Sequence, residues 1–141
     1  MSDETQKEVL DALYHRPPYL QIESYEKIQG QTITVKKTLQ PDTFYFKGHF
    51  PGAPVVPGAM MCEMIFQTSC LLLTKLYPED EKKGMAVGVL TKIRDAKFKS
   101  FLRPNDSITI KVKVVAKVGD HFQMEGLISK DDKTIALVKF N

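Results

Sequence analysis

Hydrophobic positions along the chain recur with different spacings, and each spacing predicts an element. Apolar residues follow a helical spacing between residues 4 and 14, before a pair of prolines, which predicts a short leading helix. Residues 20–39 alternate as two extended segments around a central glycine, which is typical of a hairpin. A loop rich in Gly and Pro at 48–58 leads into an apolar run at about 59–76, which ends before Pro78 and predicts a long helix.

The second half of the chain alternates with a period of two. Between residues 108 and 118, apolar residues alternate with mostly basic ones, so one face of this strand is expected to be buried and the other solvated. Turn residues divide the remainder of the chain into a meander, and Pro104-Asn105-Asp106 predicts a turn before residue 108. The extended segments expected in this half are 85–93, 96–102, 108–118, 122–129 and 134–140.

A long helix that is apolar on nearly every side must be covered on every side. The economical packing is a curved antiparallel sheet of about five or six strands wrapped around the helix. One sheet leaves part of the helix uncovered, so a second copy of the chain is the expected cover. The sequence therefore predicts an α+β fold in a single domain, residues 1–141, that works as a homo-oligomer.

Composition and charge narrow the class of partner. The chain carries 20 Lys+Arg against 17 Asp+Glu, and this scattered excess of +3 predicts no nucleic-acid partner. Cys62 and Cys70 have no His or Cys at metal-ligand spacing, so neither a zinc site nor a disulfide framework is expected and reduced cytosolic thiols fit best. The start of the chain lacks the pattern of a secretion signal, and polar residues interrupt the apolar run at 59–73. A cytoplasmic protein without membrane insertion is therefore expected.

Glu63 is the one Asp, Glu, Lys, Arg or His between residues 50 and 74. Burial of a lone carboxylate costs several kcal/mol, so this side chain is expected to hold a proton near neutral pH. Glu63 is thus a candidate general acid. Gln67 follows one helical turn later, where its amide is placed to orient the carboxyl group.

His49 lies in the loop just before the helix, and histidine is suited to proton abstraction near neutral pH. The backbone N–H groups of Gly58 and Ala59 begin the helix and are expected to hold a carbonyl oxygen as it gains negative charge. A base, an acid and an oxyanion site are what removal of water from a 3-hydroxyacyl thioester needs. On the pattern alone, two alternatives stay open: His49 is a hydrogen-bonded structural residue, and Glu63 pairs with a Lys or Arg distant in sequence.

The block Gly48–Gly58, which reads GHFPGAPVVPG, together with Glu63 and Gln67, resembles the signature of the 3-hydroxyacyl-acyl carrier protein dehydratases of bacterial type II fatty acid synthesis. Residues 13–20 resemble the N-terminal motif of that family, and residues 96–106 resemble its basic segment and the adjoining turn. The three blocks occur in the order of the family and cover most of the chain.

The resemblance implies a hotdog fold, in which a curved sheet wraps the helix and two chains join their sheets into one. It also implies a reaction, the dehydration of a (3R)-hydroxyacyl chain on acyl carrier protein to the trans-2-enoyl thioester in fatty acid or related lipid biosynthesis. No metal or organic cofactor is implied. By position, His49 is the base, Glu63 the acid, Gly58 the oxyanion donor and Gln67 the orienting residue. The family further implies that the facing His and Glu come from different subunits of a dimer and that three dimers form a hexamer.

The helix departs from the family around the acid, because Met64 and Phe66 stand where small residues are usual and Met60 replaces a common Leu. These three are the candidate residues of the acyl tunnel. Phe66 is the better candidate for blocking it, since Phe66 lies near the face of Glu63, whereas Met64 points about 100° away around the helix axis. The alternative is that Phe66 fills the dimer core.

Four basic residues lie within ten positions, namely Arg94, Lys97, Lys99 and Arg103. Carrier proteins are acidic, so this basic cluster is a candidate docking face that would steer the carrier to the tunnel mouth. The alternative is an ordinary solvated strand face.

Two other functions fit the same fold: an acyl thioesterase, which positions water against the thioester carbonyl, and a non-catalytic lipid-binding module. The pairing of His49 with Glu63 favours dehydration over both, because a module without chemistry has no physical reason to keep a buried acid. The sequence leaves open the preferred chain length, isomerisation of the double bond, the pathway, and dimer against hexamer.

Overall fold

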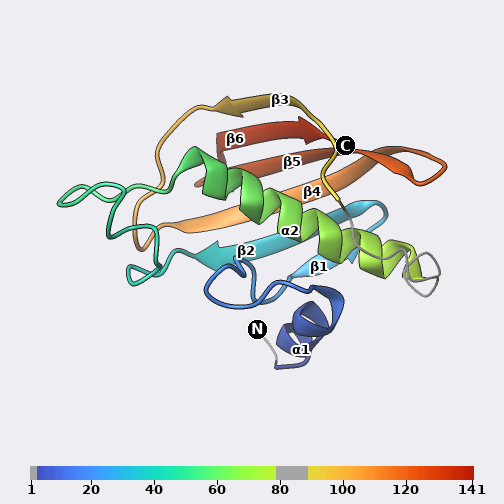
Figure 1. Cartoon of the computed structure of the whole chain (residues 1–141), viewed down its shortest axis with the longest axis horizontal. Coiled ribbons are helices and arrows are strands. Elements are labelled where there is room, and N and C mark those ends of the chain that lie inside the picture. Colours follow the sequence, from blue (N-terminus) through green and yellow to red (C-terminus); the bar gives the residue numbers. More distant parts are fainter. Residues whose placement is uncertain (1–2, 79–88) are drawn as a thin grey trace.

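The chain folds as a curved antiparallel sheet that wraps one long helix (Figure 1). The computed structural model describes residues 3–78 and 89–141. Helix α1 (Asp3–Ala12) comes first, and the long helix α2 (Gly58–Leu76) lies along one face of the sheet. The strands are β1 (Lys27–Gln29), β2 (Thr32–Thr38), β3 (Ile93–Phe98), β4 (Ser107–Val118), β5 (His121–Lys130) and β6 (Lys133–Phe140). Their order is β1-β2-β4-β5-β6-β3, and every neighbouring pair is antiparallel.

Most predicted elements are confirmed. The leading helix, the first hairpin, the long helix and the meander of β4, β5 and β6 lie where the hydrophobic spacing places them. In the first hairpin Gly30 has a φ of 61°, a region of backbone conformation that glycine adopts without a steric penalty.

The first strand is shorter than predicted. The extended segment expected from residue 20 begins only at Lys27, as β1. The preceding residues bind a helix instead of a strand, because the backbone N–H of Gln21 donates to Oε1 of Gln67 at 2.7 Å. A sequence pattern detects the extended backbone at this point but not the side-chain partner that replaces the neighbouring strand.

The extended region predicted over 85–93 and 96–102 reduces to β3. Residues 85–88 lie outside the described part of the chain, and the strand ends at Phe98. The chain then leaves the sheet, so that Leu102 is fully buried and its carbonyl accepts a hydrogen bond from the Val56 N–H at 2.8 Å. This hydrogen bond joins the segment after β3 to the loop before α2.

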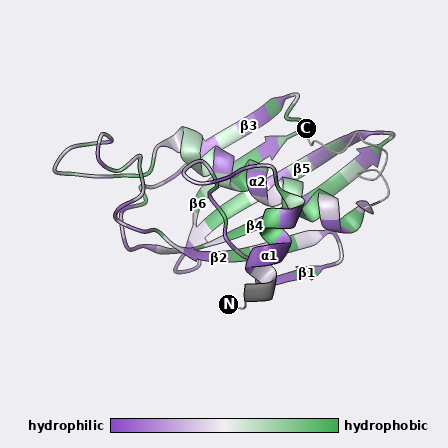
Figure 2. Cartoon of the chain, turned by 60° about the horizontal axis from the view of Figure 1, so that its bottom comes forward, coloured by the Kyte–Doolittle hydropathy of each residue, from purple (hydrophilic) through white to green (hydrophobic). Residues whose placement is uncertain are grey.

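The core lies between α2 and the sheet. Bands of hydrophobic and hydrophilic residues alternate along the strands (Figure 2). The alternation predicted for β4 continues to residue 117, with the inward residues buried up to Val112 and half-buried at Val114 and Ala116. It fails at Val118, which is 72% exposed. Large side chains with less than 2% exposure include Ile33, Met64, Ile65, Leu71, Leu72, Ile110, Met124 and Ile128.

Helix α2 is long and apolar enough to cross a membrane by length and composition alone, and no other helix in the described part of the chain is. Half of the matching window is buried inside the chain. The core helix of a globular domain passes the same test, and the sheet wrapped around α2 gives it that role.

Gly126 sets the distance between α2 and the sheet. It lies on β5, and a Cβ atom placed on it would stand 2.1 Å from Cγ2 of Ile65. Atoms do not approach so closely, so any side chain at this position would push helix and sheet apart. A glycine inside a strand often marks such a close approach. The hydrophobic spacing of the sequence alone does not predict it.

Replacement of Gly126 by Ala is expected to lower the free energy of unfolding by about 1 to 3 kcal/mol, because the added methyl group overpacks the core. Denaturant unfolding measures this loss. Adding Ile65→Ala is expected to give a double variant that loses less than the sum of the two single losses, because each change makes room for the other. Gly48→Ala is the control, since a Cβ there meets nothing within 4 Å. Additive losses would contradict the proposed contact.

Candidate active site

The His49 side chain is held by the loop on which it lies. Its Nδ1 is 3.0 Å from the carbonyl oxygen of Val55, and its ring stacks on Phe50 with centroids 4.2 Å apart. The same loop closes on itself, because the Val55 N–H donates to the His49 carbonyl at 2.8 Å. A carbonyl oxygen only accepts hydrogen bonds, so Nδ1 carries the hydrogen. In the neutral imidazole, Nε2 therefore keeps the lone pair that a base needs.

Glu63 is half-buried on α2, and its two carboxyl oxygens have different surroundings. The Tyr19 hydroxyl donates to Oε1 at 2.6 Å. Oε2 is buried and has no hydrogen-bond partner among the described residues. The bond to Glu63, together with burial, raises the pKa of Tyr19 to about 12. The partner of Glu63 seen here is thus a phenol, not the Lys or Arg that the sequence left open.

His49 and Glu63 have separate partners within one chain. The described residues contain no hydrogen bond between the two side chains, since His49 binds Val55 and Glu63 binds Tyr19. The predicted base and the predicted acid therefore belong to two different clusters of the chain, one in the loop before α2 and one on α2 itself.

Gly58 is the first residue of α2 and comes after Pro57, which has an extended backbone. The first N–H groups to find an acceptor are those of Met60 and Met61, which both donate to the Pro57 carbonyl at 2.9 and 3.1 Å. The N–H groups of Gly58 and Ala59 precede these bonds, as expected for the orphan donors of a helix start. The predicted oxyanion donors therefore lie at the positive end of the helix dipole.

Gln67 is fully buried, but its hydrogen bonds differ from the predicted one. Its Oε1 accepts from the Gln21 N–H at 2.7 Å, and its Nε2 donates to the Tyr19 carbonyl at 3.0 Å. The amide is used to hold the backbone of the segment before β1, and not to bind the carboxyl group of Glu63.

Tyr19 is the site residue that sequence reasoning missed. It belongs to the segment that resembles the N-terminal motif of the family, but no spacing or charge pattern links it to a helix residue 44 positions later. Its ring also stacks on His15, with centroids 5.9 Å apart. Only the folded chain shows that this segment covers α2 at the acid.

The three predicted tunnel residues lie on α2 at different depths. Met64 is fully buried in the core, and Met60 is partly buried against it. Phe66 is also partly buried and makes an edge-to-face contact with Phe140 of β6, with centroids 4.9 Å apart. Both Phe66 and Met64 therefore pack inside the chain.

The four residues of the basic cluster are exposed but differ in what they bind. Arg94 is anchored, because its guanidinium donates to Asn141 and to the Met124 carbonyl at 3.0 and 3.3 Å. Lys97 forms an exposed ion pair with Asp95 at 3.7 Å. Arg94 is thus held by hydrogen bonds to its own chain, whereas Lys97 makes an exposed ion pair.

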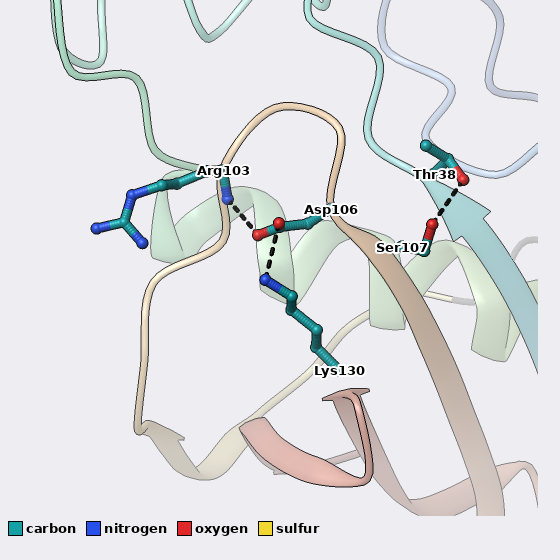
Figure 3. Close-up of polar contacts among 5 residues, drawn as sticks. All are labelled: Thr38, Arg103, Asp106, Ser107 and Lys130. Atoms are coloured by element: carbon teal, nitrogen blue, oxygen red, sulfur yellow. Dashed lines mark hydrogen bonds and ion pairs between the residues drawn. The ribbon is translucent and has the colours of Figure 1, made fainter.

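Arg103 belongs to a turn that is held by Asp106 (Figure 3). The carboxylate of Asp106 accepts from the Arg103 backbone N–H and from Nζ of Lys130, both at 2.8 Å. Burial alone would raise the pKa of Asp106, but these two hydrogen bonds, together with the charges of Lys130 and Arg103, outweigh it and lower the pKa. The Arg103 guanidinium points away from this network and lies over the Phe101 ring.

Comparisons with known proteins agree on one class of enzyme. A model of the ApeI-like family, described as ApeI dehydratase, matches residues 25–137. The 3-hydroxyacyl-acyl carrier protein dehydratase FabZ of Anaeromyxobacter sp. (strain Fw109-5) is 32% identical over 129 residues, which cover 91% of this chain and 82% of the relative.

Two solved structures share the fold. The dehydratase heterocomplex ApeI:P from Xenorhabdus doucetiae matches with a TM-score of 0.60 and 20% identity, over 82% of this chain and 90% of that one. A hypothetical thioesterase with coenzyme A from Streptococcus pneumoniae TIGR4 matches with a TM-score of 0.60 and 15% identity, over 83% of each chain. At these identities the likeness concerns the fold alone, and it confirms the predicted hotdog fold.

The family is established by extent as well as by identity. The family model spans most of the chain, and the FabZ relative exceeds 30% identity over most of both chains. The resemblance stated for the GHFPGAPVVPG block, Glu63 and Gln67 is therefore confirmed at the level of the whole chain. This chain belongs to the ApeI-like family of hotdog dehydratases and is a relative of the FabZ 3-hydroxyacyl-acyl carrier protein dehydratases.

Proposed function

We propose that the protein removes water from a (3R)-hydroxyacyl chain on acyl carrier protein and forms the trans-2-enoyl thioester. Nε2 of His49 takes the proton from C2, and the electron pair of that C–H bond forms the C2=C3 double bond. The C3–O bond breaks, and the hydroxyl leaves as water with the proton of Glu63. The observation that carries this proposal is that Nε2 of His49 and Oε2 of Glu63 are both free of partners in the described part of the chain.

A dimer would bring the two clusters together. In this proposal His49 of one subunit faces Glu63 of the other, and two copies of β3 extend the sheet. Support comes from β3, an edge strand whose side chains are mostly exposed, with Ile93 and Phe98 each 47% exposed. An exposed edge strand with apolar side chains favours pairing with another strand, which would remove these side chains from water. Assembly of three such dimers and a cytoplasmic location belong to the same proposal.

The start of α2 would stabilise the charge that develops on the substrate. As the C2 proton leaves, the thioester carbonyl oxygen gains negative charge. The N–H groups of Gly58 and Ala59 are the donors proposed to hold it. The helix dipole acts in the same direction, because its positive end lies at these residues.

Glu63→Gln and His49→Ala are each expected to lower dehydration by about 10²- to 10⁴-fold, because each removes a proton-transfer group. The assay is incubation with a 3-hydroxyacyl carrier protein, and circular dichroism checks that each variant is folded. His121→Ala and Glu26→Gln, which change exposed residues outside the site, serve as matched controls. An enoyl product supports the proposal, free acid would indicate a thioesterase, and an unchanged substrate would indicate a binding module.

The basic cluster is proposed to dock the acidic carrier protein. Reversal of charge at Lys97 and Lys99 is expected to raise the apparent KM for carrier-bound substrate by about 5-fold or more, because such charges steer association. The KM for a short 3-hydroxyacyl thioester without the carrier should stay unchanged. Lys111→Glu with Lys113→Glu gives the same change of charge on the exposed side of β4 and is the control. An equal effect on both substrates would remove the docking role.

Phe66 is proposed to limit the depth of the acyl tunnel. Phe66→Ala is expected to shift the relative kcat/KM toward longer acyl chains, measured over a series of chain lengths. If Phe66 serves packing alone, its loss would leave a cavity and cost about 3 to 5 kcal/mol without a change in selectivity. Phe122→Ala tests a second partly buried phenylalanine, which contacts Tyr77, and is expected to leave selectivity unchanged.

A further inference from the structure

The segment between α1 and β1 is fixed to α2 by two buried glutamines. The Tyr19 carbonyl accepts from Nε2 of Gln67 at 3.0 Å and from Nε2 of Gln21 at 3.1 Å. The Gln21 N–H donates to Oε1 of Gln67, and the Gln21 carbonyl accepts from Nζ of Lys37. Gln67 and Gln21 are 0% and 1% exposed, so each of these bonds replaces water that cannot reach the groups.

This clamp determines where the Tyr19 side chain lies. Gln67 stands one helical turn after Glu63 on the same face of α2, so a backbone bound to Gln67 passes beside Glu63. The Tyr19 ring bridges that distance, and its hydroxyl reaches Oε1 at 2.6 Å. A short hydrogen bond from a phenol to an ionised carboxylate is among the stronger ones in proteins, so this contact strengthens when Glu63 gives up its proton.

The contact makes the two oxygens of Glu63 unequal. An oxygen that accepts the phenol hydrogen acts as the carbonyl oxygen of the carboxyl group, so the acidic proton belongs on the other oxygen. Oε2 is that other oxygen, and it is buried without a partner among the described residues. A buried polar atom without a partner is costly, so its position favours a ligand that completes it.

The other titratable groups near Glu63 do not compete with Tyr19. Burial raises the pKa values of the Cys62 and Cys70 thiols, and that of Cys70 reaches about 11. Both thiols therefore stay neutral near neutral pH. His15 stacks on the Tyr19 ring and forms no ion pair with Glu63 in the described part of the chain.

We propose that Tyr19 is a positioning residue of the active site, which occupies Oε1 of Glu63 and thereby directs the acidic proton on Oε2 toward the substrate hydroxyl. The proposal rests on the proposed role of Glu63 as the general acid. The phenol also stabilises the carboxylate that forms when the proton leaves, so its contribution grows as the C3–O bond breaks. Tyr19 acts through Glu63 and touches no reacting atom itself.

Tyr19→Phe tests this role, because it removes the hydroxyl and keeps the ring. The kcat of dehydration is expected to fall about 10-fold with KM nearly unchanged, since the lost interaction is strongest in the transition state. The alkaline limb of the kcat profile is expected to move to higher pH, because the ionised carboxyl group loses a donor. A purely structural role would change neither the profile nor the ratio of kcat to KM effects.

Tyr25→Phe is the matched control. The Tyr25 hydroxyl donates to Glu8 at 2.5 Å, and the pKa of Tyr25 is likewise raised to about 12, but this pair lies outside the proposed site. Tyr25→Phe is expected to lower the Tm without moving the pH profile. An unmoved profile and unchanged kcat in Tyr19→Phe would overturn the proposal.

The failure of this proposal is distinguishable from failure of the proposed function. If Glu63→Gln abolishes dehydration while Tyr19→Phe changes nothing, Glu63 is the acid and Tyr19 does not position it. If Glu63→Gln retains turnover, the role of the acid is wrong and the Tyr19 proposal falls with it. The double variant is expected to be no slower than Glu63→Gln alone, and an additive loss would show that Tyr19 acts independently of Glu63.

Discussion

The burial of α2 against the sheet is the constraint on which the rest of this structure depends. The helix is apolar on most sides, so the sheet must curve around it, and Gly126 must lack a side chain for Ile65 to reach the sheet. Close packing fixes the rotation of the helix as well as its depth. That rotation turns Met64 fully into the core and leaves Glu63 half-buried at the edge of it, facing the segment that contains Tyr19.

The loop with His49 depends on the same packing through a second set of contacts. Its Val56 N–H donates to the Leu102 carbonyl, and the Leu39 N–H at the end of β2 donates to the Asp106 carbonyl, each at 2.8 Å. The turn at Asp106 is in turn held by Lys130 of β5 (Figure 3). The loop rich in Gly and Pro is thus joined through Val56 to the segment between β3 and β4, and the His49 ring is held by the Val55 carbonyl within the loop.

The sequence predicted the elements and the candidate site residues better than it predicted the contacts between residues distant in the chain. Period-two and helical spacing predicted α2 and the meander, because burial on one face is what those spacings encode. The loop motif and the lone acid of the helix predicted His49 and Glu63. The partners of Gln67 could not be predicted, because a buried amide binds whichever backbone groups the fold brings to it, and here those belong to Tyr19 and Gln21. The end of β3 was missed because the chain beyond it is held by Val56, a residue distant in the sequence, whose N–H donates to the Leu102 carbonyl.

A carboxyl group on a core helix lowers stability unless something compensates for its lost hydration. Here the compensation is incomplete, because Tyr19 binds one oxygen of Glu63 and the other stays buried without a partner in the described part of the chain. A fold selected for stability alone would place a Leu or Met at this position, as it does at Met64 and Ile65 beside it. In the proposed mechanism, an atom kept buried and unpartnered at a fixed place gives the substrate hydroxyl a proton donor that is already oriented. The local cost in stability and the proposed acid catalysis are then two consequences of one arrangement.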